Sequence, residues 1–476
     1  MVTSTGLIAL NALGPAGGYR TRDRFTISDV AGEAVAELSQ APRLFVSRAM
    51  AALHKADTLP VDERLAAIAR AGETYRTTTV DGLTAADYHY IVSRVSGMPI
   101  SAVRAAADRV AHSAAEVRRS MDLARPGGAA DDWRDPLTRD GRAVWTRRGD
   151  VFAVHAAGNH PAVHAGWLDA LALGYRVAVR PSRREPFTPH RLVSALRSAG
   201  FGDDQVVLLP TNHHAADELL RAADLSMAYG GVDVMRKYTG QANVLPQGPG
   251  LSKILLTSDA VHRDYIGMIT DSITREGGGG CVNATAVFVE GDPAPVAEAL
   301  AEQLSRIPSL PPEDDNAVLP VQSLSSAQKI EQYLLAKATG TVPWLGGDGI
   351  VDELGDGSAV LRPAVHQVDR ADAEQLRIEL PFPCVWVAPW TSKAGVEPLK
   401  DTLVLTAVTH DEQLIDDLLA EPTIGNLYIG RQPTYFTAPG LPHDGYVAEF
   451  LMRTKTVIRD TGAPSDDQDS RRVRAF

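Results

Sequence analysis

The sequence predicts an α/β protein with two doubly wound parallel-sheet domains. The chain has 476 residues, more than the roughly 250 to 300 at which a single core stops growing. Between residues 151 and 249, short apolar runs alternate with amphipathic segments, which is the pattern of repeated βαβ units. A second series of the same kind follows from 250 to 430, so we expect a second sheet there.

Residues 1–125 precede the first sheet domain, and we expect them to form a helical segment packed on it. From residue 30 to 122, Ala, Leu and Val recur at three- and four-residue spacing, as in AVRAAADRVAHSAAEVRRSMDLA. Residues 126–150 follow, with a DG dipeptide between extended segments in DPLTRDGRAVWTRR. This stretch predicts a hairpin that leads into a buried strand.

The first series, 151–249, predicts strands at VFAVHA, YRVAVR, QVVLLP and LSMAYG, with helices at PAVHAGWLDALALG, TPHRLVSALRSAG, HAADELLRAA and GVDVMRKY. The second series begins at SKILLT, continues through HRDYIGMITDSIT and NATAVFVEGD, and ends near GNLYIG. Residues 431–476 form a C-terminal segment. Parallel sheets of this kind bind ligands at the carboxyl ends of their strands.

The composition narrows the class of partner. Lys and Arg total 47 and Asp and Glu 59, a net charge of -12, which disfavours nucleic acid and anionic lipid surfaces. Only two cysteines are present, too few for a disulfide framework, so we expect a cytoplasmic protein. No run of about 18 apolar residues predicts a membrane span.

Cys281 follows four glycines in REGGGGC. A lone cysteine beside apolar residues is most often a small core residue, and GGGG is compatible with a flexible link. Glycines also let other groups approach the backbone closely, and a thiol at such a turn can meet a substrate and free backbone N–H groups. A link needs no nucleophile at its end, which favours a functional Cys281.

Asn159 lies in HAAGNHP, directly after the strand expected at VFAVHA. These residues alone favour a strand-to-helix turn in which Asn159 caps the helix. The functional alternative is that its amide stabilises an oxyanion formed on a substrate.

Two further turns lie at predicted strand ends. YRVAVRPSRREP places Arg180, Ser182 and Arg183 where a parallel sheet leaves its ligands, although a solvated basic loop has the same composition. In AYGGVDVMRKY, Gly230 and Gly231 open a helix whose N-terminus could receive a pyrophosphate, a weak motif on its own.

A metal site is not predicted. His160 and His164 are four residues apart, but HPAVH lacks the Glu of the HExxH zinc pattern and no other ligand cluster accompanies them.

The order and spacing of these motifs over roughly residues 130 to 460 resemble the aldehyde dehydrogenase superfamily. The resemblance puts Cys281 at the nucleophile and Asn159 at the oxyanion-hole asparagine. It puts Arg180 at the lysine of the Lys-Pro-Ser-Glu cofactor segment, with Arg183 near its acidic residue, and Gly230 and Gly231 at the cofactor phosphates. ELPFP is similar to the Glu-x-Phe-Gly-Pro segment, which implies that Glu379 lies near the nicotinamide ribose. The expected division is then a cofactor domain at 151–249, a catalytic domain at 250–430 and an oligomerisation hairpin at 126–150 with the 431–476 segment returning to it.

The chain departs from hydrolytic members of that superfamily. Their Glu-Leu-Gly-Gly-Lys segment supplies the base that activates water, whereas the corresponding stretch here reads QGPGLSK, without an acid. This pattern resembles the thioester-reducing branch, namely the fatty acyl-CoA reductases of luciferase systems and the phenazine antibiotic biosynthesis-like proteins of secondary metabolism. The resemblance implies reduction of an acyl thioester, on coenzyme A or an acyl carrier protein, to an aldehyde through a thioacyl-Cys281 intermediate.

Arg180 and Arg183 favour NADP(H) over NAD(H), because guanidinium groups attract a 2′-phosphate. Two alternatives remain open. One is an NAD(P)-dependent dehydrogenase that oxidises an aldehyde to an acid or acyl-CoA, with Glu276 as the replacement base, and the other is a catalytically silent binding or assembly subunit. By resemblance we expect a homodimer or homotetramer.

Overall fold

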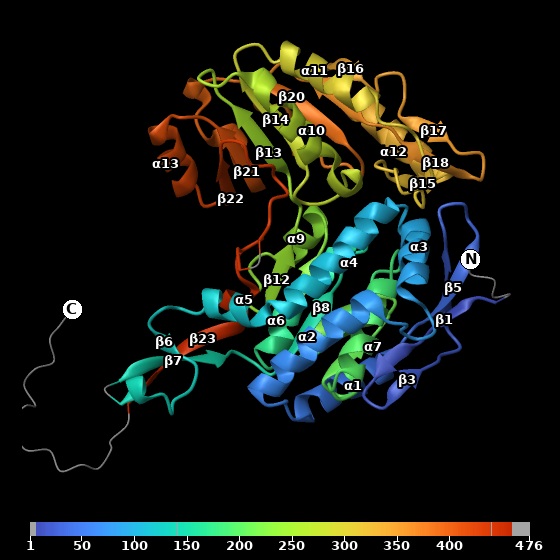
Figure 1. The fold of residues 1–476 in the computed structure, drawn as a ribbon, viewed down its shortest axis with the longest axis vertical. Coiled ribbons are helices and arrows are strands. Elements are labelled where there is room, and N and C mark those ends of the chain that lie inside the picture. Colours follow the sequence, from blue (N-terminus) through green and yellow to red (C-terminus); the bar gives the residue numbers. More distant parts are fainter. Residues whose placement is uncertain (1–5, 140, 439, 459–476) are drawn as a thin grey trace, which may run out of the picture.

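Two seven-stranded sheets, one in each lobe of the molecule, position the other elements (Figure 1). The computed structural model describes residues 6–139, 141–438 and 440–458. The first sheet has the order β12-β11-β8-β9-β10-β2-β3. Its parallel part contains β8 (Val151–His155), β9 (Arg176–Arg180), β10 (Val206–Leu208), β11 (Leu225–Tyr229) and β12 (Val244–Gln247), and β2 (Ala12–Gly14) and β3 (Gly17–Tyr19) extend one edge antiparallel.

The strand order of the first sheet reverses between β8 and β11. From β8 the chain moves outward through β9 and β10, then returns to add β11 and β12 on the other side of β8. Loops after two such strands diverge to opposite faces and leave a crevice at the carboxyl end, which is where open α/β sheets bind ligands. Residues 156–160 and 230–231 follow these two strands.

Helices cover both faces of this sheet. One face packs against α1 (Arg43–Lys55) and α8 (His213–Ala222), with the short α9 (Val232–Tyr238) beside them. The other face packs against α2 (Val61–Thr77), α4 (Ile100–Ala115), α6 (Leu168–Ala172) and α7 (Phe187–Ser198), with α3 (Ala85–Ser96) and α5 (Val117–Ala124) outside them. Burial on both faces explains the unbroken apolar runs of β8 and β9.

The second lobe repeats the plan. Its sheet has the order β16-β19-β20-β14-β13-β21-β22, parallel except for the edge strand β16. The strands are β13 (Ser252–Leu256), β14 (Ala284–Glu290), β16 (Val342–Leu345), β19 (Ala364–Gln367), β20 (Cys384–Trp390), β21 (Thr402–Val408) and β22 (Ile424–Ile429). Helices α10 (Ile266–Thr274) and α11 (Ala294–Ser305) cover one face, and α12 (Leu324–Lys337) and α13 (Glu412–Ala420) the other.

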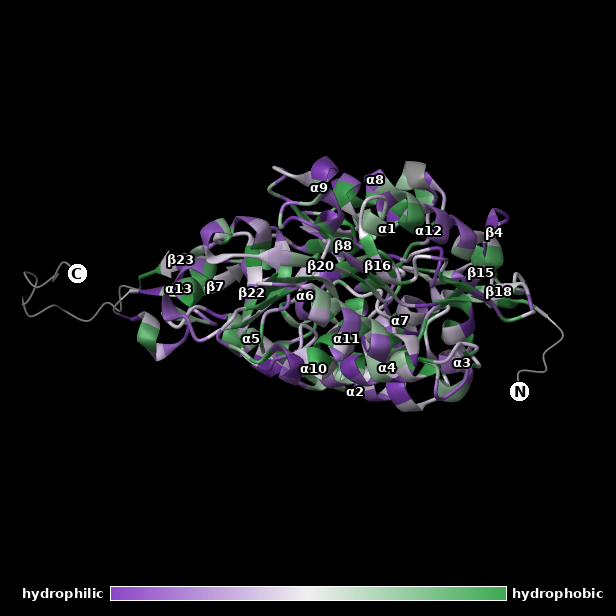
Figure 2. Ribbon diagram, turned by 90° about the horizontal axis from the view of Figure 1, so that it is seen from above, coloured by the Kyte–Doolittle hydropathy of each residue, from purple (hydrophilic) through white to green (hydrophobic). Residues whose placement is uncertain are grey.

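The predicted fold class, α/β with two parallel-sheet domains, is confirmed. Figure 2 shows the apolar colouring concentrated along central strands such as β8 and β20, with polar colouring on the outer helices. Within the described ranges, no helix is both long enough and apolar enough to cross a bilayer.

The prediction that residues 1–125 are helical was wrong for the first part of that segment. Residues 8–39 form strands, and β1 (Ile8–Leu10), β5 (Ala34–Ser39) and β4 (Arg24–Ser28) make a three-stranded sheet of their own. In β5, AVAELS, the buried side chains of Ala36 and Leu38 alternate with less buried ones, which is a strand period. Its pairing with β1 and β4 overrides the helix propensity of Ala, Glu and Leu.

The predicted hairpin within 126–150 is also wrong. β7 (Arg142–Arg147) pairs in parallel with β6 (Ala129–Ala130), and a parallel pair cannot be joined by a tight turn. The antiparallel partner of β7 is β23 (Met452–Val457), which follows α14 (Val447–Leu451) near the C-terminus. Asp140 of the DG dipeptide and the tail from 459 lie outside the described residues.

The N-terminal helices touch the second lobe at its small sheet of β15 (Val321–Ser323), β18 (Ser358–Leu361) and β17 (Val351–Glu353). Gly97 ends α3 in the left-handed region, at φ 72°, and its carbonyl accepts from the Val321 N–H at 2.8 Å. Beside it, Arg94 forms an ion pair with Asp29 at 2.8 Å and another with Glu313 at 3.3 Å. This junction fixes the two lobes relative to each other.

We predict that Gly97→Ala lowers the free energy of unfolding by roughly 2 to 4 kcal/mol, because it adds both a left-handed backbone penalty and a clash. An added Cβ would lie 1.8 Å from the carbonyl oxygen of Val321. Gly32→Ala is the matched control, since Gly32 also has positive φ (90°) but open space around it. Urea unfolding should show a loss of about 1 to 2 kcal/mol for the control. Equal losses in the two variants would contradict a tight lobe junction.

Candidate active site

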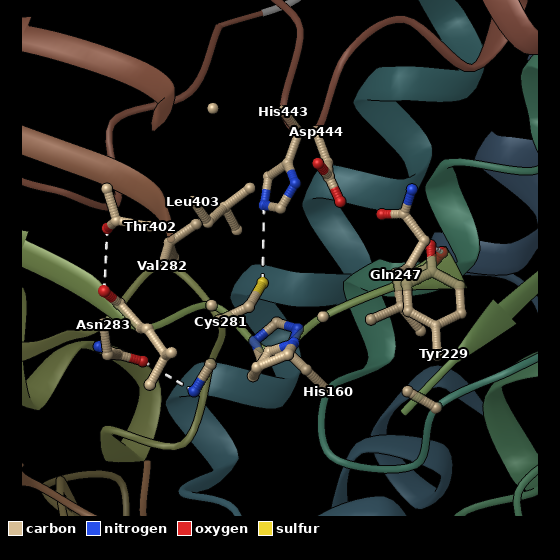
Figure 3. Close-up of a pocket in the computed structure, with 18 of the residues that line it drawn as sticks. His160, Tyr229, Gln247, Cys281, Val282, Asn283, Thr402, Leu403, His443 and Asp444 are labelled. Carbon is tan, nitrogen blue, oxygen red and sulfur yellow. Dashed lines mark hydrogen bonds between the residues drawn. The ribbon is translucent and has the colours of Figure 1, made fainter. Parts of the chain in front are cut away.

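A cavity of about 1920 Å³ is lined by residues of both lobes, and Cys281 is one of them. The cysteine lies on the loop between α10 and β14, and its side chain is half-buried. Figure 3 shows its sulfur in the cavity, facing the ring of His443. Cys384, by contrast, is enclosed in the core of the second lobe.

Hydrogen bonds fix residues 275–283 from within; we call this segment the nucleophile loop after the role predicted for Cys281. Asn283 accepts the Gly280 N–H at 2.8 Å and donates to the carbonyls of Ser272 and Arg275, each at 3.1 Å. The Ser252 hydroxyl donates to the Cys281 carbonyl at 2.8 Å. The Cys281 backbone is therefore held in place independently of any ligand.

Two of the glycines before Cys281 are needed for the backbone conformation of the turn. Gly277 and Gly278 have φ of 86° and 71°, and an added Cβ on Gly278 would lie 2.6 Å from the nitrogen of Pro383. These two residues are required by the turn itself. A fifth glycine, Gly250, matters as much, because its Cβ would lie 1.9 Å from the Cys281 carbonyl oxygen.

Glu276 connects the nucleophile loop to two other elements. Its carboxylate accepts two bonds from the Arg109 guanidinium of α4, at 2.5 Å each, and one from His160 Nε2 at 2.5 Å. The Nδ1 atom of His160 accepts the Ala162 N–H at 3.1 Å, so Nε2 carries the donated proton. Glu276 itself is in the left-handed region, at φ 54°, and only 13% of its side chain is exposed.

This pairing argues against Glu276 as a replacement base. Burial alone would raise the pKa of its carboxyl, but the bonds from His160 and Arg109 outweigh burial and hold the pKa well below its ordinary 4.5. A carboxylate so stabilised is a poor proton acceptor at neutral pH. Glu276 instead holds the loop of His160 and α4 against the nucleophile loop.

His443 is a titratable side chain in direct contact with Cys281. Its Nε2 lies 3.7 Å from Cys281 Sγ, and its carbonyl accepts from the Asn426 side chain at 2.5 Å. Burial, assisted by Glu379 and Asp444, raises the pKa of the Cys281 thiol to about 12, although the N–H groups of Cys281 and Val282 partly stabilise the thiolate. Burial lowers the pKa of His443. The pair is therefore a neutral thiol beside a neutral imidazole, which is able to accept the thiol proton.

Asp444 and Gln247 occupy the remaining side of the sulfur. Figure 3 shows Gln247 and Tyr229 on the opposite side of the cavity from Thr402 and Asn283, with Asp444 above them. Burial raises the pKa of Asp444, and the neighbouring His443 partly offsets this. Gln247 ends β12, where its amide neither accepts nor releases a proton at neutral pH.

Asn159 lines the same cavity in the loop after β8, and its Nδ2 donates to the Gly279 carbonyl at 3.3 Å. The helix-capping interpretation does not describe it, since the side chain of His160 caps the following short helix η2 (Pro161–Ala165). An amide donor directed at the nucleophile loop has the chemistry of an oxyanion donor.

The predicted cofactor residues divide into two groups. Ser182, Gly230, Gly231 and Glu379 line the cavity together with Cys281. Burial raises the pKa of Glu379, and the N–H groups of Leu251 and Gly250 partly offset the rise.

The two predicted arginines do not line the cavity. Arg180 donates to the Thr211 hydroxyl at 3.0 Å and to the Thr211 carbonyl at 3.3 Å. Arg183 lies over the ring of Phe25, 5.0 Å from its centroid, and donates to Gln40 at 3.5 Å.

The crevice has free backbone of the kind that binds the phosphates of a nicotinamide dinucleotide. Gly158 packs so closely on Ser182 that an added Cβ would lie 2.2 Å from the Ser182 hydroxyl, whereas Gly231 has open space beside it. The backbone at Gly231 is therefore accessible to a phosphate. Among the described residues, no group of three or more His, Cys, Asp or Glu has the geometry of a metal site.

Sequence reasoning missed His443, Asp444 and Arg109. The LPHDG stretch gave no signal, because a His-Asp pair in a Pro- and Gly-containing loop has no distinctive period. Arg109 sits in a regular helical pattern and reads as an exposed charge until α4 is placed against the nucleophile loop.

Comparison with known proteins gives a consistent result. A sequence model described as the aldehyde dehydrogenase family matches residues 22–448. Curated proteins gave no match. The fold is similar to that of an NAD-dependent aldehyde dehydrogenase from Sinorhizobium meliloti, with TM-score 0.81, 18% identity and coverage of 97% of this chain and 96% of the other.

Two other solved structures are comparably similar. KauB, an aldehyde dehydrogenase from Pseudomonas aeruginosa, has TM-score 0.81 at 16% identity, covering 94% of this chain and 96% of its own. Indole-3-acetaldehyde dehydrogenase AldA from P. syringae, solved with NAD+ and IAA, has TM-score 0.80 at 16% identity, covering 95% and 97%. At these identities the likeness concerns the fold.

We predict that Glu276→Gln destabilises the protein by about 1 to 3 kcal/mol at pH 7, because it leaves the half-buried Arg109 without its counter-charge. The difference in unfolding free energy between the two proteins should have its full size above the ordinary carboxyl pKa of 4.5. It should shrink as the pH falls below that value, because the folded state keeps Glu276 charged while the unfolded chain takes up a proton. Urea unfolding of both proteins from pH 3.5 to 8 measures this. A difference that does not change with pH would contradict the ion-pair account.

We predict that His443→Gln slows acylation of Cys281 by about 100-fold, the lower range for loss of a general base. The measurement is the burst of nitrophenol when p-nitrophenyl acetate acylates the enzyme. His410→Gln is the control, because His410 is 78% exposed and lies outside the cavity lining. An undiminished burst in His443→Gln would show that another group takes the proton.

Proposed function

The chain belongs to the aldehyde dehydrogenase family, and we propose that it reduces an acyl thioester to an aldehyde with NADPH. Membership confirms the predicted enzyme class, an oxidoreductase that acts on an aldehyde or oxo group with a nicotinamide cofactor. The proposal adds the direction of the reaction and the acyl donor, which is coenzyme A or an acyl carrier protein.

Gln247 is the observation that carries the proposal. It lines the cavity beside Cys281 and is the first residue of QGPGLSK, the stretch in which hydrolytic relatives are expected to present a glutamate. An amide does not deprotonate water, so a thioacyl group on Cys281 would persist until hydride or another thiol reaches it. Glu276, which the sequence offered as a replacement for that base, accepts hydrogen bonds from Arg109 and His160 instead.

The proposed roles of the residues follow from the geometry. His443 Nε2 accepts the thiol proton, and Cys281 Sγ attacks the thioester carbonyl, whose oxygen takes a bond from Asn159. The bond from the carbonyl carbon to the carrier sulfur breaks, and His443 returns the proton to the departing thiolate. The acyl group is then bonded to Cys281.

A bound nicotinamide supplies the hydride that reduces this thioacyl group. Asn159 again donates to the carbonyl oxygen as it becomes negatively charged. When that oxygen re-forms its double bond, the bond to Cys281 Sγ breaks, the aldehyde leaves, and the thiolate recovers a proton from solvent through His443. One thioester, one NADPH and one proton thus give one aldehyde, one free thiol and NADP⁺.

The preference for NADP(H) rests on Arg180 and Arg183. Both lie at the carboxyl end of β9, next to the cavity-lining Ser182. The side-chain partner of Arg180 is Thr211 and that of Arg183 is Gln40, and both partners are neutral. Either guanidinium could therefore turn toward a 2′-phosphate without breaking an ion pair.

Asp444 favours a second candidate, oxidation of an aldehyde to an acid. It lines the cavity near the nucleophile and burial raises the pKa of its carboxyl, which strengthens it as a base for water. The two candidates share the thioacyl enzyme and differ in what removes the acyl group.

We predict that acyl-coenzyme A and NADPH give aldehyde with matched consumption of NADPH, and that without NADPH the acyl group accumulates on Cys281. Absorbance at the NADPH band and intact-protein mass spectrometry measure the two. Cys281→Ala should abolish both, whereas Cys384→Ala, which removes the only other thiol from the core, should retain them.

The variant Gln247→Glu sharpens this test, since it should hydrolyse the adduct at least about 100-fold faster by restoring a water-activating base. Sustained release of acid by the unmodified enzyme from aldehyde and NADP⁺, without coenzyme A, would overturn the proposal in favour of oxidation.

A further inference from the structure

The side-chain amide of Asn159, the proposed oxyanion donor, is held only weakly by its own contacts. Its Nδ2 donates one N–H to the Gly279 carbonyl at 3.3 Å, which leaves the second N–H for a substrate oxygen. The residue is exposed, and among the described residues no other hydrogen bond involves its side chain. A single long bond at an exposed position does not fix an amide within the narrow geometry that an oxyanion donor needs.

The two neighbours of Asn159 in the chain are held much more firmly. On one side, Gly158 lies so close to Ser182 that an added Cβ would be 2.2 Å from the Ser182 hydroxyl oxygen. On the other side, only 12% of the His160 side chain is exposed, and both of its ring nitrogens have partners. The backbone of Asn159 is therefore fixed from both ends, and this backbone decides where the amide lies.

The two nitrogens of His160 bind different parts of the molecule. Nδ1 accepts the Ala162 N–H at 3.1 Å and so caps η2, which directly follows His160 in the chain. Nε2 donates to Glu276 at 2.5 Å, and Glu276 belongs to the nucleophile loop of the second lobe. The first bond is local, whereas the second joins the loop that carries Asn159 to the loop that carries Cys281.

The carboxylate of Glu276 is a fixed anchor for this second bond. Arg109 binds both of its oxygens, at 2.5 Å each, and a bidentate pair of this kind sets the plane of the carboxylate. The rest of the nucleophile loop is fixed as well, because Asn283 bonds to the Gly280 N–H and to the Arg275 carbonyl. His160 is thus connected to the backbone of Cys281 through groups that are themselves held in place.

We propose that His160 is a positioning residue, which sets the distance and direction of the Asn159 amide from Cys281 through its bond to Glu276. The inference rests on the proposed function only in the acylation of Cys281, a step that the reduction and the oxidation share. The oxyanion forms as the sulfur attacks. A displaced amide therefore lowers the rate of attack and leaves the binding of the substrate unchanged.

Two replacements of His160 separate its two bonds. Asparagine puts an oxygen where the imidazole has Nδ1, which keeps the cap of η2, but its side chain is too short to reach Glu276. Glutamine puts its amide nitrogen where the imidazole has Nε2, which keeps the donor to Glu276 and gives up the cap. We expect His160→Asn to slow acylation by about 10- to 100-fold and His160→Gln to stay within about threefold of the unmodified enzyme.

The measurement is the burst of nitrophenol from p-nitrophenyl acetate, followed over a range of ester concentrations. In His160→Asn the limiting burst rate should fall, whereas the ester concentration that gives half of that rate should stay the same. Normal acylation in His160→Asn together with slow acylation in His160→Gln would overturn the inference, because the cap would then be the bond that matters.

Asn159→Ala extends the measurement to a double-mutant cycle. Alone, it should slow the burst by about 100-fold or more. Added to Asn159→Ala, the His160→Asn change should cause no further loss, because no amide is left to displace. Additive losses would show that His160 acts on another group and would also overturn the inference. The burst requires no NADPH, so an enzyme that behaves as expected here but reduces no thioester would retain the role of His160 and overturn the reductase.

Discussion

The ion pair between Glu276 and Arg109 is the interaction on which the site depends. It ties the nucleophile loop of the second lobe to α4, a helix of the N-terminal segment, and the bond from His160 adds the loop that carries Asn159. Three chain segments that share no sheet are thus held in register around one sulfur. A buried carboxylate with two cationic or proton-donating partners tolerates little displacement, because losing either partner leaves a desolvated charge. The left-handed backbone of Glu276 persists because these bonds outweigh its strain.

The same constraint decides which proton chemistry remains available near Cys281. Because Glu276 is fully engaged, its charge stabilises structure and it does not act as a base. The thiol has a raised pKa and the imidazole of His443 a lowered one, so the resting pair is uncharged and becomes reactive through proton transfer over 3.7 Å. Gln247 is inert toward protons, whereas burial raises the pKa of both Asp444 and Glu379 and so strengthens each carboxylate as a base. In the proposed reaction, a base that activates water beside the thioacyl group favours oxidation to the acid, and the amide of Gln247 favours reduction.

The cavity has different characters at its two ends. The crevice between β8 and β11 offers exposed backbone at Gly231 and a hydroxyl at Ser182, groups that suit a phosphate-containing cofactor. The wall formed by α4, α5 and α6 contributes the polar side chains of Arg109, Ser120 and Asp169 to the lining.

The sequence by itself determined the features that repeat at short range. Unbroken apolar strands between amphipathic helices specified two parallel sheets, and the REGGGGC stretch marked Cys281, because periodicity and glycine content are local properties. Only the tertiary structure decided the rest. Cys281 and His443 are 162 residues apart and Arg109 and Glu276 are 167 apart, and no local pattern encodes such pairs. The strands at 8–39 and the pairing of β7 with β23 depend likewise on distant partners that satisfy their backbone hydrogen bonds. Local chemistry thus indicated Cys281 as the candidate nucleophile, whereas long-range packing placed His443 beside its sulfur.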